Sequence, residues 1–129
     1  LWRDLPNHQI PPGFFSEEAL AVARLSSKTH ADIVADVDGR PLHLLISHPT
    51  PPGFDGNEDR NGRRNHDEVA FWSAYLDQDA SWLSDDLGGQ GPLGDADFVI
   101  LGDLNVDPVD GDARHEAIQA LLSHPRVQD

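Results

Sequence analysis

The chain has 129 residues, with 23 acidic side chains against nine lysines and arginines, a formal net charge of −14 and no cysteine. This composition excludes disulfides and thiolate metal sites, and it argues against a broad basic surface for nucleic acid. No apolar run approaches the ~20 residues that a helix needs to cross a bilayer, so the sequence predicts no membrane span.

The first 20 residues are predicted to be irregular, because prolines and a glycine interrupt any period. We expect Trp2, Phe14 and Phe15 to hold this segment on the core. Residues 16–20 are predicted to form one helical turn, and residues 20–26 to be extended.

A β-hairpin is predicted around Asp38-Gly39, which lies between the apolar runs 31–37 and 42–47. This dipeptide favours a type I′ turn, in which both central residues have positive φ. Lys28 and His30 precede the hairpin. Either residue could face a site, although surface positions are favoured. His48 follows the second arm, where a proline-rich stretch ends the strand.

A helix is predicted to begin near Asn65, because Asn65 and Glu68 together resemble a capping box. Val69, Trp72 and Leu76 recur at helical spacing and give this helix its buried stripe.

A basic cluster, Arg60, Arg63 and Arg64, comes just before this predicted helix start. Guanidinium groups bind phosphate through bidentate contacts, and free backbone N–H groups at a helix start favour the same ligand. Arg63, Arg64 and Asn65 are therefore candidates for binding a substrate phosphate. The alternative is that these arginines balance the neighbouring carboxylates in a solvated loop, and the cluster taken alone favours that alternative.

The strand that organises the chain is predicted at 97–101, after a long surface loop over 77–96 that Trp82 and Leu83 anchor. The uninterrupted apolar run indicates a strand buried on both faces. Gly102 lets the backbone turn at its end, and Asp103 and Asn105 follow at once.

The last helix is predicted to follow a turn over 108–111 and to be capped by Asp112. Its apolar stripe consists of Ala117, Ile118, Leu121 and Leu122.

The predicted order of elements is strand, strand, helix, strand, helix. A helix between two strands favours a parallel pair, so the strands 42–47 and 97–101 are expected to end at the same edge of the sheet. Ligands bind at this edge in sheets of this kind. We therefore expect His48, Asp103 and Asn105 to converge in one cleft.

These motifs resemble those of the endonuclease/exonuclease/phosphatase superfamily, which includes pancreatic-type deoxyribonucleases, apurinic endonucleases, sphingomyelinases and inositol-phosphate phosphatases. Gly102-Asp103-Leu104-Asn105 is similar to its Gly-Asp-x-Asn motif. The segment 46–49 resembles its strand ending in the catalytic histidine, and 48–68 resembles a bacterial branch. The resemblance covers most of residues 20–126.

The resemblance implies an α/β fold that is part of a four-layer α/β/β/α sandwich of the deoxyribonuclease-like type, and metal-dependent phosphoester hydrolysis. It implies that Asp103 orients or deprotonates the attacking water, that Asn105 binds a phosphate oxygen, and that His48 donates a hydrogen bond or proton to the phosphate. Asp103 and Asn105 would hold a divalent metal, with Mg²⁺ expected first and Mn²⁺ or Ca²⁺ as alternatives. Such cleavage needs an activated water and a neutralised phosphate.

The superfamily also has an Asn and a metal-binding Glu upstream and an Asp-His pair near its C-terminus, and neither is found in its expected place. His66-Asp67 has the reverse order and does not substitute. We therefore expect residues 1–129 to be a single incomplete domain, the central segment of a catalytic domain, and inactive alone. Open strand edges would then favour self-association.

Two other interpretations remain open. Residues 103, 105 and 107 match the first ligand positions of a calcium loop, although Pro108 and Arg114 stand where that loop needs Gly and Glu. The chain would then be a non-catalytic or calcium-binding structural module. A nuclease is disfavoured by the charge of −14, because duplex binding depends on phosphate neutralisation. A small-molecule or lipid head-group phosphoester suits the acidic chain better.

Overall fold

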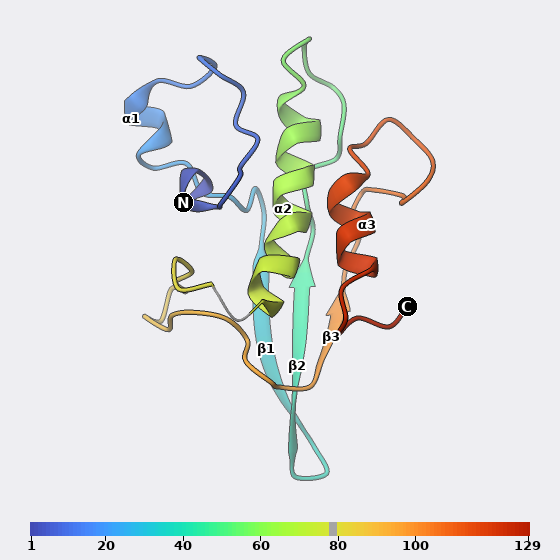
Figure 1. The fold of residues 1–129 in the computed structure, drawn as a ribbon. Helices are drawn as coiled ribbons and strands as arrows, with labels where there is room; N and C mark the ends of the chain where they lie inside the picture. Colours follow the sequence, from blue (N-terminus) through green and yellow to red (C-terminus); the bar gives the residue numbers. More distant parts are fainter. Residues whose placement is uncertain (78–79) are drawn as a thin grey trace.

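A computed structural model of the chain describes residues 1–77 and 80–129. The elements in these ranges are η1 (Trp2–Asp4), α1 (Glu17–Leu20), β1 (His30–Val37), β2 (Arg40–Ser47), α2 (Arg60–Leu76), β3 (Phe98–Leu101) and α3 (Glu116–Leu122) (Figure 1).

The three strands form one mixed sheet in the order β1-β2-β3. β1 pairs antiparallel with β2, with His30 opposite Ser47, and β2 pairs in parallel with β3, with Leu45 opposite Ile100. The turn at 38–39 has the two positive φ angles, 53° and 82°, that were expected. The hairpin, the parallel pair and the α/β class are therefore confirmed.

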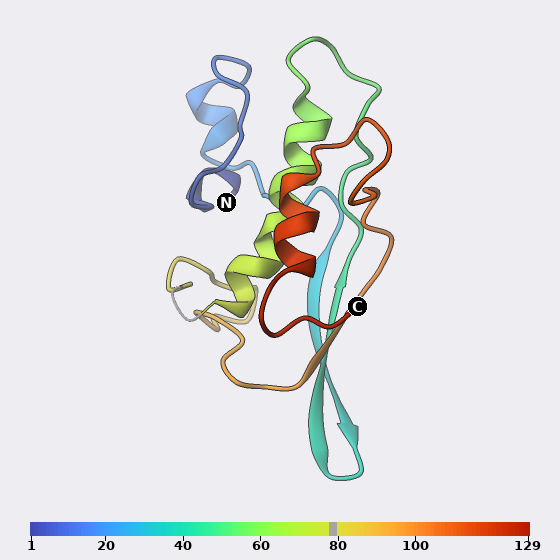
Figure 2. The same cartoon turned by 45° about the vertical axis from the view of Figure 1, so that its right-hand side comes forward.

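Helices α2 and α3 lie together on one face of this sheet (Figure 2). Their predicted apolar stripes pack against the buried Leu45 of β2, because both helices turn one apolar side towards the strands. The buried residues of this core are Leu45, Val69, Trp72, Leu76, Ala117, Ile118 and Leu121.

The opposite, outer face of the sheet has no helix or strand against it in the described part of the chain (Figure 2). Ile33, Leu44 and Val99 are paired across the three strands on this face. Its side chains between the hairpin tip and the strand ends are all apolar: Ala31, Ile33, Ala35, Leu42, Leu44, Ile46, Val99 and Leu101. Val99 is 41% exposed and Leu101 is 43% exposed. The prediction that this strand is buried on both faces is therefore wrong, because only Phe98 and Ile100 contact the helical core.

The N-terminal segment packs as a second, smaller cluster around the fully buried Trp2. The predicted helical turn is confirmed as α1, where the Ser16 hydroxyl accepts a hydrogen bond from the Ala19 N–H at 3.2 Å. Residues 20–26 form no strand, so that prediction is wrong. The Ala23 carbonyl instead accepts the Trp2 N–H at 2.9 Å, so this backbone holds the N-terminus rather than a sheet.

Both long-helix starts differ from the predicted positions. α2 begins at Arg60 rather than near Asn65, because the Asp55 carboxylate in the preceding loop accepts the free N–H of Asn61 in the first turn. α3 begins at Glu116 rather than after Asp112. The preceding loop is held away from a helical path by Arg114, whose Nε donates to Asp59 Oδ2 at 2.7 Å.

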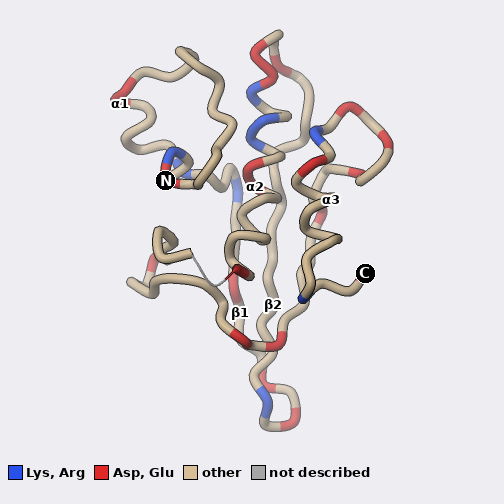
Figure 3. The backbone as a smooth tube through the Cα atoms, viewed as in Figure 1, with Lys and Arg blue, Asp and Glu red and all other residues tan. Residues whose placement is uncertain are grey.

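The loop predicted over 77–96 is confirmed in its described part, residues 77 and 80–96, where a single bridge joins Ser84 and Gln90. Residues 78 and 79 lie outside the described ranges. Leu83 is buried and Trp82 packs against the N-terminal cluster, as expected of anchors. Figure 3 shows acidic residues spread over the loops and basic residues gathered in the first turns of α2.

Candidate functional site

The loops after β2 and β3 meet at one edge of the sheet. Gly102 lies against the backbone of Ser47, and a Cβ atom at position 102 would be only 1.9 Å from the Ser47 carbonyl oxygen. Three residues after Gly102, Asn105 Nδ2 donates to the Pro49 carbonyl at 3.1 Å. His48 directly follows β2, Asp103 is the second residue after β3, and both residues are exposed. The structure thus brings the two predicted strand-end motifs together at one edge, which is open to solvent.

Asp103 and Asn105 form a local turn that fixes their orientation. Asp103 Oδ1 accepts the Asn105 N–H at 2.9 Å, and Asn105 adopts a left-handed φ of 53°, which Asn tolerates better than most residues. One carboxylate oxygen of Asp103 and the amide oxygen of Asn105 have no hydrogen-bond donor in the described part of the chain. These two oxygen atoms are therefore available to accept a hydrogen bond from a ligand or to coordinate a metal.

The helix α2 holds this edge together through a buried polar stripe. Asn65 Nδ2 donates to the carbonyls of Thr50 and Leu104, both at 2.9 Å, and so ties the two strand-end loops to each other. One turn later, the Glu68 carboxylate accepts the N–H groups of Ser27 and Thr50, both at 2.5 Å. Asn65 and Glu68 are fully buried. Asn65 and Glu68 therefore hold the loops at this edge in place from inside the core, and their side chains are not exposed to a ligand.

The predicted capping box at Asn65 and Glu68 is therefore wrong, since both residues lie inside α2. A different signal in the sequence marks their role. Asn65, Glu68 and Trp72 are three and four residues apart, so they lie on the same face of α2. Trp72 Nε1 donates to the Ser47 hydroxyl at 2.8 Å. Polar residues at core positions of a helix need buried partners, and here the partners are loop backbone groups.

The basic cluster is mostly engaged in structural contacts. Arg64 donates to the carbonyls of Leu25 and Arg24, at 3.1 and 2.7 Å, and its guanidinium lies 5.1 Å from the centre of the Trp2 ring. Arg63 Nε donates to the Glu58 carbonyl at 2.9 Å. The structure does not bring Arg64 or the buried Asn65 to the open edge with His48.

Lys28 is exposed, as the sequence predicts, and it also lies at this edge. Lys28 Nζ is 3.4 Å from the carbonyl oxygens of both His48 and Pro49. The hairpin register explains this position, because His30 pairs with Ser47 and the chain before β1 therefore runs beside the chain after β2.

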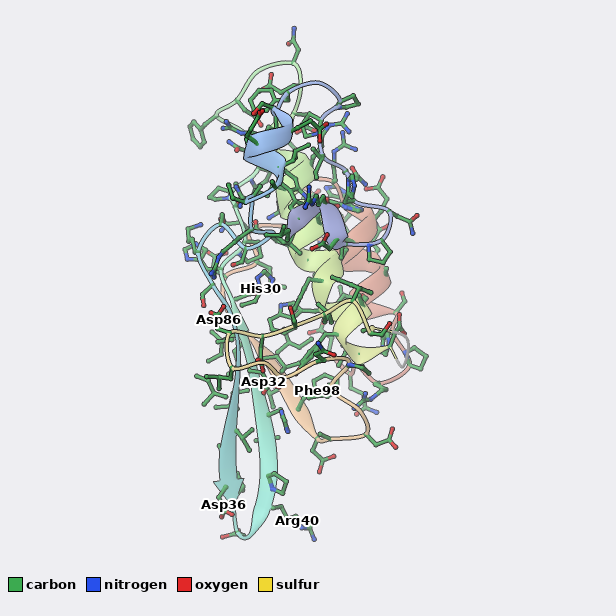
Figure 4. All side chains as sticks on the ribbon, turned by 90° about the vertical axis from the view of Figure 1, so that its left-hand side faces the viewer. His30, Asp32, Asp36, Arg40, Asp86 and Phe98 are labelled. Atoms are coloured by element: carbon green, nitrogen blue, oxygen red, sulfur yellow. The ribbon has the colours of Figure 1, made fainter. Side chains whose placement is uncertain are left out.

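A cavity of about 710 Å³ lies between β1, α2 and the 83–92 loop, and Lys28 is among the residues that line it. Asp32 in its wall accepts from Tyr75 Oη at 2.6 Å and contacts His43 Nδ1 at 2.7 Å. Figure 4 shows Asp32 on β1 near the loop that carries Asp86. Burial and then the bond to Asp32 raise the pKa of Tyr75, so its hydroxyl stays protonated. This cluster ties α2 to the hairpin and offers no activated nucleophile.

The oxygen donors at the open edge suit a magnesium ion that keeps most of its waters, because Mg²⁺ is commonly held by one or two protein oxygens. No group of three or more His, Asp or Glu side chains within residues 1–77 and 80–129 is arranged to hold a metal by itself. In the calcium-loop alternative the third ligand is Asp107, but its Oδ1 already accepts the N–H groups of Val109 and Asp110 at 2.8 Å.

Comparison with known proteins found no matching family model, no matching curated sequence and no matching solved structure. Among the described helices, none is both long enough and apolar enough to cross a membrane, in agreement with the sequence prediction.

Proposed function

We propose that this chain forms part of a metal-dependent phosphoesterase of the endonuclease/exonuclease/phosphatase superfamily. The observation that carries the proposal is the contact between the two strand-end motifs. β2 and β3 run parallel, and Asn105 of the Gly-Asp-x-Asn motif is hydrogen-bonded to Pro49, the neighbour of His48. A carboxylate, an amide and an imidazole therefore follow two strands that end at the same edge.

The chemistry assigned to each group follows from its type and exposure. The exposed Asp103 carboxylate orients or deprotonates the attacking water, and the second role requires it to be within reach of the water's proton. Asn105 binds a phosphate oxygen, and its tether to Pro49 keeps the amide in place. His48 donates a hydrogen bond or proton to the phosphate as charge develops. A magnesium ion held by Asp103 and Asn105 would supply neutralisation of the phosphate charge.

The outer face of the sheet supports the four-layer sandwich proposed with this function. A row of Ala, Val, Ile and Leu side chains, including the half-exposed Ile33, is suited to packing against a second sheet. In such a sandwich, the helices cover one sheet on the outside and the apolar faces of the two sheets meet inside.

The substrate class that the charge favours is a small or lipid-linked phosphoester. The chain carries a net charge of −14, and its acidic residues are spread over the loops (Figure 3). A duplex needs many phosphates neutralised at once, whereas a single ester phosphate needs only one local positive site.

The test is hydrolysis of soluble phosphomonoesters and phosphodiesters, with Mg²⁺ or Mn²⁺, by the protein expressed from its complete open reading frame. Asp103→Asn should lower turnover by about 10²–10⁴-fold, the range for a lost general base, while thermal melts stay unchanged. Asp110→Asn is the matched control, because it makes the same chemical change on an exposed residue of the same loop. Near-normal turnover in Asp103→Asn would defeat the catalytic assignment.

A further inference from the structure

Lys28 is the only lysine in the chain, and the hairpin places it at the open edge. Its ammonium contacts the carbonyl oxygens of His48 and Pro49, both at 3.4 Å. Pro49 also accepts the Asn105 amide at 3.1 Å, so the backbone of residues 48–49 contacts side chains from the stretch before β1 and from the loop after β3.

The contacts of Lys28 leave most of its binding capacity unused. A distance of 3.4 Å is longer than the usual 2.7–3.2 Å of an N–H···O hydrogen bond, and a lysine ammonium has three donors. Within the described ranges Lys28 makes no ion pair with a carboxylate. An exposed ammonium with two long contacts remains free to bind an anion.

The arginines near this edge are less available. Arg64 donates to two backbone carbonyls and covers Trp2, and Arg63 donates to the Glu58 carbonyl. Arg60 donates twice to the Asn61 side chain and lies 5.5 Å from the centre of the Phe14 ring. Lys28 is therefore the cation beside the strand-end loops whose only side-chain contacts in the described ranges are two long ones to backbone carbonyls.

We propose that Lys28 binds the phosphate group of the substrate at the edge where β2 and β3 end. This assignment rests on the proposed function, which makes the same edge the site of phosphoester hydrolysis. A single point charge matches one phosphate group and not a polyanionic backbone. The ligand is thus a phosphoester with one accessible phosphate, either a soluble ester or a lipid head group.

Amine acylation tests this binding without any need for turnover. In a polypeptide of residues 1–129 the two primary amines are those of Lys28 and the Leu1 backbone, so mass spectrometry can follow each one separately. Inorganic phosphate with Mg²⁺ should slow acylation of Lys28 about threefold at a concentration of twice the Kd, by simple occupancy. The N-terminal amine is the internal control and should keep its rate. Equal slowing of both amines, or no slowing of Lys28, would overturn the assignment.

Two further arms of the labelling experiment separate the two sources of the phosphate. Glycerol phosphate represents a soluble ester, and phosphatidylcholine vesicles containing phosphatidic acid represent a lipid head group. Protection by glycerol phosphate identifies a soluble ester, and protection by these vesicles alone identifies a head group. Lack of protection in both arms counts against the site.

Variants of Lys28 then link the site to catalysis in the complete protein. Lys28→Gln should raise KM by about tenfold to a hundredfold, as expected for a lost charge-assisted hydrogen bond, with a smaller change in kcat. Lys28→Arg keeps the charge and should recover part of this loss. Arg40→Gln is the matched control, because it removes one positive charge at the hairpin tip, at the far end of β1 from Lys28 (Figure 4).

The two proposals fail in different ways. If Asp103→Asn abolishes hydrolysis while Lys28→Gln leaves KM unchanged, the function stands and Lys28 is not the phosphate-binding group. If Lys28 is protected by phosphate while Asp103→Asn leaves hydrolysis unchanged, the anion site stands and the proposed catalytic role of Asp103 fails.

Discussion

Gly102 and Ser47 are packed backbone to backbone, at the level where β2 and β3 both end. The φ of Gly102 is 139°, which side chains rarely adopt, and a Cβ there would be 1.9 Å from the Ser47 carbonyl oxygen. Any side chain at position 102 therefore pushes the two strand ends apart. The distance between the His48 and Asp103 loops depends on this glycine.

We expect Gly102→Ala to lower the free energy of unfolding by about 2–4 kcal/mol, through backbone strain and steric overlap. Gly111→Ala is the matched control, because Gly111 also has a positive φ, of 88°, but a Cβ there meets nothing within 4 Å. That control should cost only ~1 kcal/mol. Urea denaturation of both variants measures the difference, and equal costs would contradict the close contact.

Glu68→Gln should destabilise the fold by about 2–3 kcal/mol, because one of two backbone N–H groups loses its carboxylate acceptor and meets an amide donor instead. These are the N–H groups of Ser27 and Thr50. Their amide hydrogen exchange should therefore accelerate in the variant. Glu17→Gln, on the exposed surface of α1, is the control and should change stability by less than ~0.5 kcal/mol. Unchanged exchange at both amides would show that Glu68 does not hold these loops.

The elements that local rules govern were predictable from the sequence. The Asp38-Gly39 turn, the apolar stripe of α2 and the parallel crossover each follow from a short pattern with one dominant physical cause. Because the parallel crossover sets where both strands end, the shared edge of His48 and Asp103 was predictable as well.

The parts that failed depend on contacts that no local sequence pattern contains. Asp55 caps the first turn of α2 from outside the local pattern, and Arg114 reaches Asp59 across the fold. Lys28 is exposed, as predicted, but only the hairpin register shows that it lies beside the chain after β2. The exposed side of β3 was missed because a run of apolar residues is the same whether one or both of its faces are covered.

Arg64 is expected to affect stability rather than substrate binding. Arg64→Lys should lower the free energy of unfolding by about 1–3 kcal/mol, because a lysine cannot donate to the Leu25 and Arg24 carbonyls in the same fork geometry. Arg40→Lys at the hairpin tip is the control. Chemical denaturation and KM are measured for both variants. A raised KM with unchanged stability in Arg64→Lys would instead support the phosphate-binding role that the sequence predicted.

His30 should make the fold less stable at acidic pH. Burial lowers the pKa of His30 below its usual 6.5, and its Nε2 donates to the Glu68 carbonyl at 2.8 Å. The unfolded chain then binds a proton more readily than the folded chain, so stability rises with pH in this range. The stability is fully present above about pH 6.5 and decreases as pH falls through the lowered pKa, by up to ~1.4 kcal/mol per pH unit for one group.

The check is the pH dependence of the free energy of unfolding in the wild type and in His30→Gln. The variant should show a shallower slope between neutral and mildly acidic pH. His8→Gln, on an exposed histidine, should follow the wild type. Parallel slopes for the wild type and His30→Gln would refute the assignment to His30.

The open sheet should make the 129-residue chain self-associate. β1 and β3 are the two edges of the sheet, and the outer face between them exposes Ile33 at 50% and Val99 at 41%. Unpaired strand edges and an uncovered apolar face both favour contact with a second copy. Analytical ultracentrifugation over a concentration series should show the sedimentation coefficient rising with concentration.

Val99→Lys places a charge on this face and should suppress the rise in sedimentation coefficient. Val109→Lys changes an equally apolar loop residue, which is 76% exposed, and should leave the rise unchanged. A wild-type chain that stays monomeric throughout the series would contradict the prediction, and equal suppression by both variants would assign the association to general charge repulsion instead of the sheet face.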